Sequence, residues 1–252
     1  MGSVRQSINI LYQTTKASFK IRNANTYLGI CWYLLGPILT FVVLLLVFSH
    51  RLGADIEHYP LYLLSGIVIW NFFSMGTSRS LTCVFGQAGL IKSLPVRREL
   101  LVLSTVLDVL ISHLFEIAVL FAIAAYYGVL SFTVVFIPIV LLLNFIFTLG
   151  VSYALAALMF VFRDLGQIWS IVTKVWWFAT PIFYALYEGG KGEKVSMFNP
   201  MFHVLDISRD VLIYGTVPGF KSLLILSAFS FATLFIGILI FRKLYPHFAE
   251  YV

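Results

Sequence analysis

Long apolar runs, separated by short polar stretches, recur along this chain and constrain its fold more than any other feature. A bilayer core about 30 Å thick is crossed by a helix of about 20 apolar residues. Lipid offers no partner to backbone N–H and C=O groups, so such runs fold as helices. The pattern predicts an all-α integral membrane protein with about six transmembrane helices in a single domain, residues 1–252. The predicted spans are residues 31–48, 61–84, 100–127, 134–162, 168–186 and 223–241.

The composition excludes an ordinary soluble protein. Hydrophobic residues make up 60% of the chain and charged residues 11%, whereas soluble domains have roughly 45–50% apolar and about 25% charged residues. A soluble chain of 252 residues with this composition would lack polar side chains to cover its surface. The net charge of +6 comes from basic residues scattered between the apolar runs. We therefore expect membrane lipid as a partner and no nucleic acid.

The placement of lysine and arginine predicts the orientation. Cytosolic loops of membrane proteins carry an excess of these residues. With the N-terminus inside, the cytosolic side collects Arg5, Lys16, Lys20, Arg22, Lys92, Arg97, Arg98, Arg163, Lys174, Arg242 and Lys243. The outer side has Arg51, Lys191, Lys194, Arg209 and Lys221, mixed with acidic residues. Both termini are therefore predicted to be cytosolic, which requires an even number of spans.

Residues 1–30 are predicted to form an amphipathic interface helix and the transition into the first span. Apolar residues recur at helical spacing with basic residues beside them. The apolar members are Val4, Ile8, Leu11, Tyr12 and Phe19. This pattern is typical of a helix in the lipid headgroup region. The alternative is a helix that packs on the cytosolic face of the protein.

The fifth apolar run is interrupted by Lys174 and by Thr180-Pro181. Residues 187–220 are mixed in character and contain Asn199-Pro200. We expect a broken span followed by short re-entrant outer helices. Non-helical backbone at membrane depth is tolerated only where it is buried in protein or lines a water-filled cavity. The break therefore indicates a pathway or a gate.

Four segments together resemble the permease subunits of type-2 ABC exporters, particularly those that export polysaccharides such as O-antigens, capsules and teichoic acids. These are YLGICWYLLGP at 27–37, LIKSLPVR at 90–97, FRDL at 162–165, and TPIFY at 180–184 followed by NPM at 199–201. In order and at these intervals they cover nearly the whole chain. One position departs from the family pattern, because Val96 stands where relatives often have arginine or a similar polar residue.

The resemblance implies a homodimer with a central channel, bound to two ABC ATPase subunits in the bacterial cytoplasmic (inner) membrane. The implied substrate is a lipid-linked polysaccharide such as O-antigen. The chain has no GxxxxGK[ST] phosphate loop. We therefore expect no enzymatic activity, no catalytic residue and no cofactor in this chain, with ATP and Mg bound by the partner subunit.

Two cytosolic segments are candidates for coupling to the ATPase. The resemblance assigns a coupling helix to residues 87–99 and a second contact to the turn at 163–164. The candidate residues are Gln87, Lys92, Ser93, Leu94, Pro95, Arg97, Arg98, Glu99, Arg163 and Asp164. The basic residues offer charge-assisted contacts, and the proline stiffens the segment. The alternatives are charges that only set the topology and, at 163–164, an internal salt bridge.

Aromatic residues make up 17% of the chain. Their rings can stack on the C–H faces of sugars, and weak binding at many points would let a glycan slide. The candidate channel residues are Trp32, Tyr33, Trp70, Phe73, Tyr153, Trp176, Trp177, Phe183 and Tyr184. Interfacial belts and ordinary packing are the alternative roles for these side chains.

Ionisable residues inside predicted spans are costly and therefore informative. They are Arg79, Asp108, His113, Glu116 and Lys174. Ion pairs are the favoured role, with Asp108 or Glu116 as the partner of Arg79; a proton relay is the other. A metal site is not expected. A permease for a drug or lipid and a proton-coupled transporter remain as alternative functions, whereas no cluster of catalytic carboxylates points to a membrane transferase.

Overall fold

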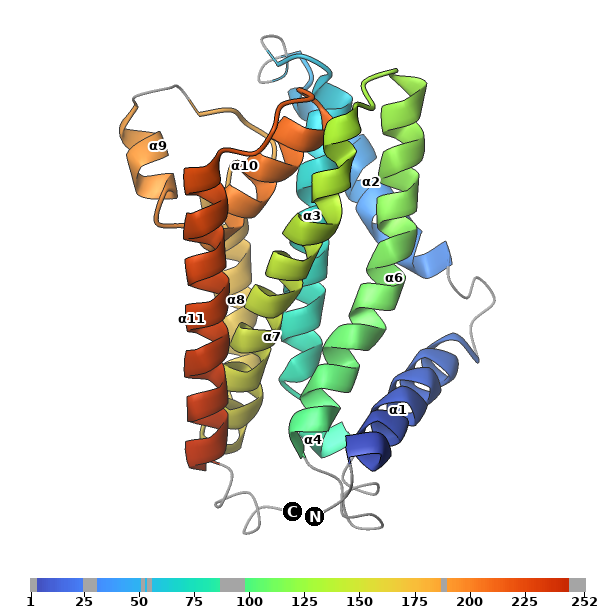
Figure 1. Cartoon of the computed structure of the whole chain (residues 1–252), viewed down its shortest axis with the longest axis vertical. Coiled ribbons are helices and arrows are strands. Elements are labelled where there is room, and N and C mark those ends of the chain that lie inside the picture. Colours follow the sequence, from blue (N-terminus) through green and yellow to red (C-terminus); the bar gives the residue numbers. More distant parts are fainter. Residues whose placement is uncertain are drawn as a thin grey trace.

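The protein folds as a helical bundle in which several long helices run roughly along one axis and others lie oblique to it (Figure 1). The structure, a computed structural model, describes residues 4–24, 31–50, 53, 56–86, 98–186 and 190–244. This part of the chain contains helices, turns and loops but no strand, which confirms the all-α prediction for it. The elements are α1 (Val4–Ala24), α2 (Cys31–Phe48), α3 (Tyr59–Ser80), α4 (Cys83–Gly86), α6 (Arg98–Tyr126), η1 (Phe132–Phe136), α7 (Ile137–Val161), α8 (Leu165–Ala179), α9 (Lys191–Ser196), α10 (Pro200–Leu212) and α11 (Phe220–Leu244).

Each predicted span corresponds to a helix, and all but the first differ from it in their end residues. The first coincides with α2, and the second ends early, at Ser80, where a turn leads into α4. The fifth is shortest, because α8 ends at Ala179 and the residue before a proline disfavours helical backbone. Within the described residues, four segments are long and apolar enough to cross a membrane: α3, α6, η1 with α7, and α11. The described apolar part of α2, Leu34–Phe48, and α8 are shorter, so about six spans stays a prediction.

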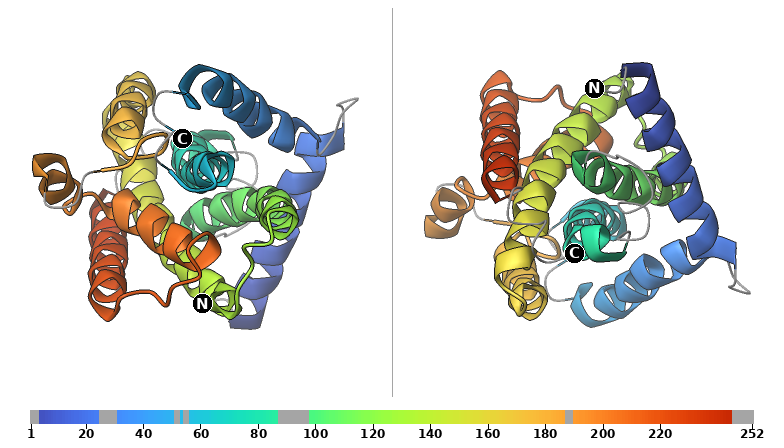
Figure 2. Two further views of the ribbon diagram at one scale, coloured as in Figure 1. Left: turned by 90° about the horizontal axis from the view of Figure 1, so that it is seen from above. Right: turned by 90° about the horizontal axis from the view of Figure 1, so that it is seen from below.

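Helix α3 lies in the middle of the bundle, with α2, α6 and α7 packed around it (Figure 2). It is the least apolar of the four long helices and the most enclosed, because 78% of its apolar 18-residue stretch is buried, against 17% for α11. Its buried polar side chains include Ser65, Thr77 and Ser80, whose hydroxyls donate to backbone carbonyls of their own helix. Enclosure by protein is what allows so polar a helix to stand in this position.

Helices α7 and α11 meet backbone to backbone. A Cβ atom on Gly237 would overlap the carbonyl oxygen of Gly150, and one on Gly150 would meet the backbone of Thr233 and Leu234. Small residues at such crossings let membrane helices approach closely, since lipid provides no hydrophobic force to press them together. Helix α11 can therefore lie this close to α7 only because residues 150 and 237 are glycines.

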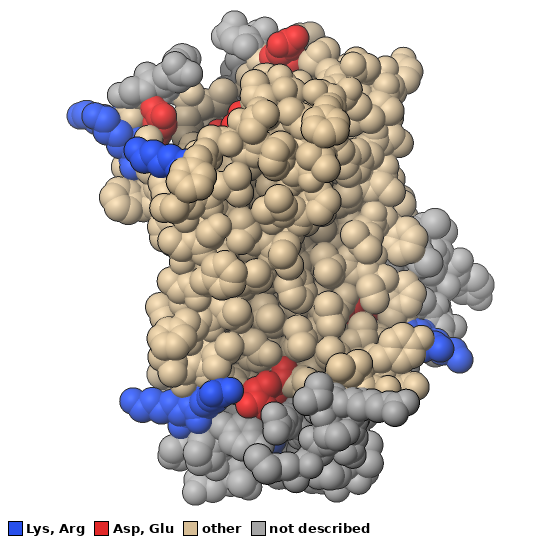
Figure 3. All heavy atoms as spheres, viewed as in Figure 1, with Lys and Arg blue, Asp and Glu red and all other residues tan. Residues whose placement is uncertain are grey.

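The two ends of the bundle differ in what they carry (Figure 1). One end, called the terminal end, holds the start of α1, the end of α11, the start of α6 and the α7–α8 turn. The opposite end, called the α9 end, holds α9 and α10. On the face shown in Figure 3, lysine and arginine gather at two levels, and a broad belt of uncharged surface separates them. This distribution is typical of a protein that spans a membrane.

Helix α1 lies across the outside of the bundle and packs on α6 (Figure 2). Thr14 and Thr15 are buried, whereas Ile8 and Tyr12 are 59% and 60% exposed. The amino group of Lys16 lies 5.7 Å from the centre of the Tyr12 ring. One face of α1 therefore contacts protein, whereas Ile8, Tyr12 and Lys16 face outward. Packing on the protein and a position in the lipid headgroup region are thus compatible for this helix.

Candidate functional site

The break after α8 is held by a buried arginine of α10. Arg209 donates from Nη1 to the carbonyl of Pro181 at 2.8 Å and from Nη2 to that of Ile182 at 2.9 Å. Nη2 also lies 3.3 Å from the carbonyl oxygen of Tyr62, and the guanidinium stands 3.4 Å above the Tyr62 ring. The arginine is 4% exposed. A planar guanidinium with five donors suits this role because it serves several acceptors and stacks on a ring at once.

Two tyrosines of α3 complete the set of donors to the break. The Tyr59 hydroxyl donates to the carbonyl of Phe183 at 3.0 Å, and that of Tyr62 to the carbonyl of Tyr184 at 2.9 Å. Four consecutive carbonyls, at residues 181–184, thus each accept a hydrogen bond from a side chain. These bonds replace those that a continuing helix would have made, so the unwound backbone can remain inside the protein.

The two proline-containing motifs meet through Asn199. Its Nδ2 donates to Oγ1 of Thr180 at 2.9 Å, and its Oδ1 accepts from the Trp176 indole at 2.9 Å. The same Oδ1 accepts from the backbone N–H of Met201 at 3.0 Å and so caps the start of α10. One asparagine therefore fixes the end of α8 to the beginning of α10.

The role of Arg209 was not predicted from the sequence, which placed this residue among the charges of the outer side. In the structure Arg209 lies on the buried face of α10, and its place on the outer side stays a prediction. Leu205, four residues before it, and Leu212, three residues after it, are both buried. A cation inside an apolar stripe with helical spacing was the available signal.

Six predicted channel aromatics form two groups of ring contacts where α3 meets α8 and the break, and Trp70 of one group and Trp177 of the other line the same hollow; the six are called the aromatic cluster. The Trp176 ring centre lies 6.0 Å from that of Trp70 and 5.1 Å from that of Phe73. The Phe183 ring centre lies 5.2 Å from those of both Trp177 and Tyr184. Trp176, Trp177, Phe183 and Tyr184 are partly exposed. The cluster therefore has an outer part that a ligand could touch.

Two candidates, Phe73 of the cluster and Tyr153 outside it, belong to the core. Phe73 is fully buried, so a substrate has no access to its ring. Tyr153 is 6% exposed; its ring packs against Phe241 at 5.5 Å and its hydroxyl donates to the Glu99 carbonyl at 3.2 Å, away from the cluster. Both side chains pack inside this chain, and the channel role predicted for them stays a prediction. Trp32 and Tyr33 lie on α2, and their side chains fall outside the part that the structure describes.

Two hollows lie beside the aromatic cluster. One of about 320 Å³ is lined by α2, including Pro37 and Thr40, and by Trp70, Ser74 and Trp177. A second of about 150 Å³ shares the last three residues and adds the exposed Lys174 of α8. The space between α2, α3 and α8 is therefore lined by indole rings, hydroxyl groups and the ammonium group of Lys174.

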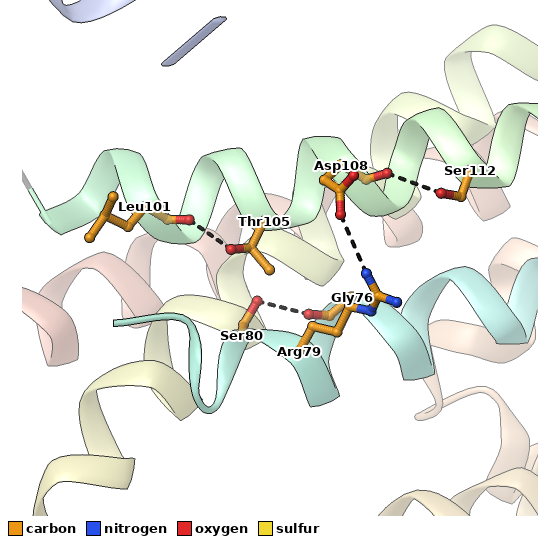
Figure 4. A network of polar contacts seen from close by, with 7 residues as sticks. All are labelled: Gly76, Arg79, Ser80, Leu101, Thr105, Asp108 and Ser112. Carbon is orange, nitrogen blue, oxygen red and sulfur yellow. Dashed lines mark hydrogen bonds and ion pairs between the residues drawn. The ribbon is translucent and has the colours of Figure 1, made fainter. Parts of the chain in front are cut away.

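A row of polar contacts joins α3 to α6. Arg79 reaches across to Asp108, with 3.3 Å between Nη1 and Oδ2 (Figure 4). Asp108 is 4% exposed, and the Ser112 hydroxyl donates to its backbone carbonyl. Of the two partners that the sequence analysis considered for Arg79, the structure places Asp108 in contact.

About two helical turns from this pair, Asn71 of α3 donates to Oε1 of Glu116 on α6. His113 lies with Nδ1 3.0 Å from Oε2 of Glu116, and its ring stacks on Phe72 at 4.9 Å. Both ionisable residues are at least nine-tenths buried. Within the described residues no group of three possible ligands could hold a metal ion. The contacts instead fasten α3 to α6 in a region where polar groups need partners.

Removal of one member of the Arg79–Asp108 pair is expected to cost more than removal of both. Arg79→Met leaves a buried carboxylate without its cation, and because Arg79 is partly exposed we expect a loss of about 2 kcal/mol in unfolding free energy. The double variant Arg79→Met/Asp108→Leu should recover most of this loss. Denaturant unfolding of the purified protein measures both. Equal stabilities of the single and double variants would contradict the expectation.

The candidate ATPase contacts lie at the terminal end as far as they are described. Gln87, Lys92, Ser93, Leu94, Pro95 and Arg97 fall outside the described residues. Arg98 and Glu99 form the start of α6. Arg163 and Asp164 are exposed in the α7–α8 turn. That turn and the start of α6 lie at the same end of the bundle (Figure 1).

At the α9 end, burial raises the pKa of the Asp210 carboxyl to about 6, with a further contribution from nearby Asp206. The raised value means that the folded state favours the protonated acid. Asp210 therefore contributes to stability below about pH 4 and loses this contribution as the pH rises through about 6. Asp210→Asn, which stays neutral, should be more stable than the parent by about 1 kcal/mol at about pH 8 and equal to it at about pH 4.

Thermal unfolding at the two pH values measures the Asp210 effect. Asp164→Asn provides a matched control, because Asp164 is an exposed carboxylate in a turn. The same stabilisation in both variants would show that net charge, and not burial of Asp210, is responsible.

The long apolar helices, the belt of uncharged surface and the broken helix beside a hollow define a multi-pass membrane protein with an internal polar site. The sequence profile of the family described as ABC-2 type transporter matches residues 10–213, and the chain belongs to this family. It is thus a transport subunit, and a multi-pass protein of the bacterial inner membrane.

Characterised relatives extend over nearly the same length. The chain is 26% identical over 246 residues to the O-antigen export system permease protein RfbA of Myxococcus xanthus, covering 96% of this chain and 94% of the relative. It is 28% identical over 245 residues to an O-antigen export system permease protein RfbA of Klebsiella pneumoniae, with the same coverage. The polysialic acid transport protein KpsM of Escherichia coli is 26% identical over 223 residues, 85% of each chain.

Proposed function

We propose that this chain is the channel-forming permease subunit of an ATP-driven exporter that moves a lipid-linked polysaccharide across the inner membrane. Relatives named for O-antigen export and polysialic acid transport support the substrate class. The observation that carries the proposal is the aromatic cluster at the break after α8. Its partly exposed rings offer stacking surfaces for sugars, and a glycan held by many weak contacts can move on.

ATP hydrolysis belongs to two partner ATPase subunits, which bind ATP and Mg and dock at the terminal end. This end carries the start of α6 and the α7–α8 turn, the two segments proposed for coupling. It faces the cytosol, together with both termini, and the α9 end faces outward. Residues 187–220, with α9 and α10, then form the re-entrant outer segment that closes the pathway.

A second copy of this chain completes the channel. Helices α2 and α8 flank the hollows beside the aromatic cluster. Both present exposed apolar side chains, such as Leu46 on α2 and Ile171 and Val175 on α8. In a homodimer, these two helices would border a pathway lined by the partly exposed aromatics of both copies.

Deletion of the gene tests the function, with surface polysaccharide as the measurement. Loss of the polymer, restored by the parent chain, is the expected result, and Trp177→Ala/Tyr184→Ala should restore export only at a reduced rate. Phe235→Ala is the matched control, since Phe235 is an exposed aromatic on α11 away from the cluster. A deletion strain with unchanged surface polysaccharide would refute the proposed function. Full restoration by the double variant would exclude the aromatic cluster as the lining.

A further inference from the structure

A third hollow, separate from those beside the aromatic cluster, lies at the α9 end. This outer cavity has a volume of about 640 Å³ and is bounded by α9, α10, α11 and the break. Small-molecule sites commonly have volumes of about 300–1,000 Å³. Its lining includes carboxylates, one ammonium group, an imidazole and aromatic rings. The polar and aromatic members are Tyr62, Glu193, Phe202, His203, Asp206, Arg209, Asp210, Tyr214, Thr216, Lys221 and Ser222.

The charges of the outer cavity favour a ligand rich in hydrogen-bond donors. Glu193, Asp206 and Asp210 bring three carboxylates, which accept hydrogen bonds. The guanidinium of Arg209 is already committed to the backbone carbonyls of the break. Among the described lining residues, Arg209 and Lys221 bring two cations against these three acids. The cavity therefore has no excess of positive charge that would select an anion, and its carboxylates can accept hydrogen bonds from hydroxyl groups.

Two features indicate that burial of polar groups beside this cavity is energetically unfavourable. His203 is 4% exposed and lines the cavity; its Nε2 contacts the Met197 carbonyl, and its Nδ1 has no hydrogen-bond partner among the described residues. Burial raises the pKa of both Asp206 and Asp210. Buried polar groups that lack protein partners are expensive unless a ligand or water satisfies them.

The aromatic residues supply the second half of a sugar site. Phe202, Tyr214 and Tyr62 line the same cavity. Carboxylates that accept from adjacent hydroxyls, next to rings that cover apolar C–H faces, recognise a saccharide better than a purely polar or purely apolar ligand. We propose that the outer cavity binds a saccharide unit of the exported polymer; the identity of the polymer rests on the proposed function.

The position of the cavity couples such binding to the break. Arg209 and Tyr62 line the cavity and also donate to the carbonyls of Pro181, Ile182 and Tyr184. A saccharide that touches the cavity side of these residues therefore shares their contacts with the unwound segment. The outer cavity is therefore a saccharide-binding site next to the segment proposed to close the pathway.

The test uses the permease–ATPase complex in lipid nanodiscs, with maltose and chitobiose as probes. Saturation-transfer NMR should detect both sugars on the parent complex. Asp206→Asn/Asp210→Asn should weaken binding about tenfold, the effect of losing one charge-assisted hydrogen bond. Ala185→Trp, which fills the cavity from an exposed position, should do the same without altering a charge. Glu57→Gln is the control, because Glu57 is exposed and does not line the cavity.

Absence of a sugar signal on the parent complex, or equal signals in the parent and both cavity variants, would overturn the inference. Recovery of the ATPase with each variant establishes that the complex has assembled. Failure of the cavity inference can be distinguished from failure of the proposed function. If the gene deletion abolishes surface polysaccharide while the cavity variants bind sugar normally, the function stands and the cavity has no part in it.

Discussion

Replacement of Arg209 by methionine is expected to release the unwound segment at residues 181–184 and to abolish export. The substitution leaves the carbonyls of Pro181 and Ile182 buried without their donor. Each buried unsatisfied group costs about 1–3 kcal/mol, so we expect a loss of about 4 kcal/mol in unfolding free energy. Denaturant unfolding of the purified permease–ATPase complex and surface polysaccharide in complemented cells measure the two effects.

Two further variants distinguish the hydrogen-bonding geometry of the Arg209 guanidinium from its positive charge. Arg209→Lys keeps the positive charge but cannot serve separate carbonyls and stack on Tyr62 at once, so an intermediate loss is expected. Lys191→Met removes an exposed cation at the same end and should behave like the parent chain. Arg209→Met with parental stability and export would show that the break does not depend on this residue.

Gly237→Ala is expected to separate α11 from α7. The added methyl group would overlap the Gly150 carbonyl oxygen, and that atom belongs to a helix backbone that cannot move aside locally. We expect a loss of about 3 kcal/mol in unfolding free energy, with a matching fall in the amount of folded protein in the membrane.

Gly166→Ala is the matched control for that change. It makes the same substitution inside α8, where a Cβ atom would meet nothing within 4 Å, and helix propensity alone favours alanine over glycine. We therefore expect unchanged or slightly increased stability. If both alanine variants unfold alike, the contact of α7 with α11 does not limit stability.

The positions of the helices could be predicted from the sequence, because long apolar runs leave the backbone few alternatives in lipid. Their ends could not be placed equally well. The fifth run reads as apolar as far as Leu186, yet α8 ends at Ala179. Hydrogen bonds from Tyr59, Tyr62 and Arg209, which are distant in the sequence, stabilise the unwound backbone. The sequence pattern around the fifth apolar run cannot identify hydrogen-bond partners that are so distant along the chain.

The candidate site was predictable in kind but not in detail. Thr180-Pro181 and Asn199-Pro200 were both singled out, but their direct contact through Asn199 is a tertiary fact. Phe73 was assigned to the channel because of its residue type. Helix α3 is surrounded on most sides, and an apolar periodicity cannot show which side faces a pathway when nearly all sides are buried.

The enclosed position of α3 has a consequence for biogenesis. A segment that carries Asn71, Arg79 and several hydroxyls, and that is the least apolar of the long helices, is poorly held by lipid alone. Its partners Asp108 and Glu116 are on α6, which the ribosome makes later. We therefore expect stable insertion of α3 to follow the synthesis of α6, whose side chains supply the partners of its polar residues.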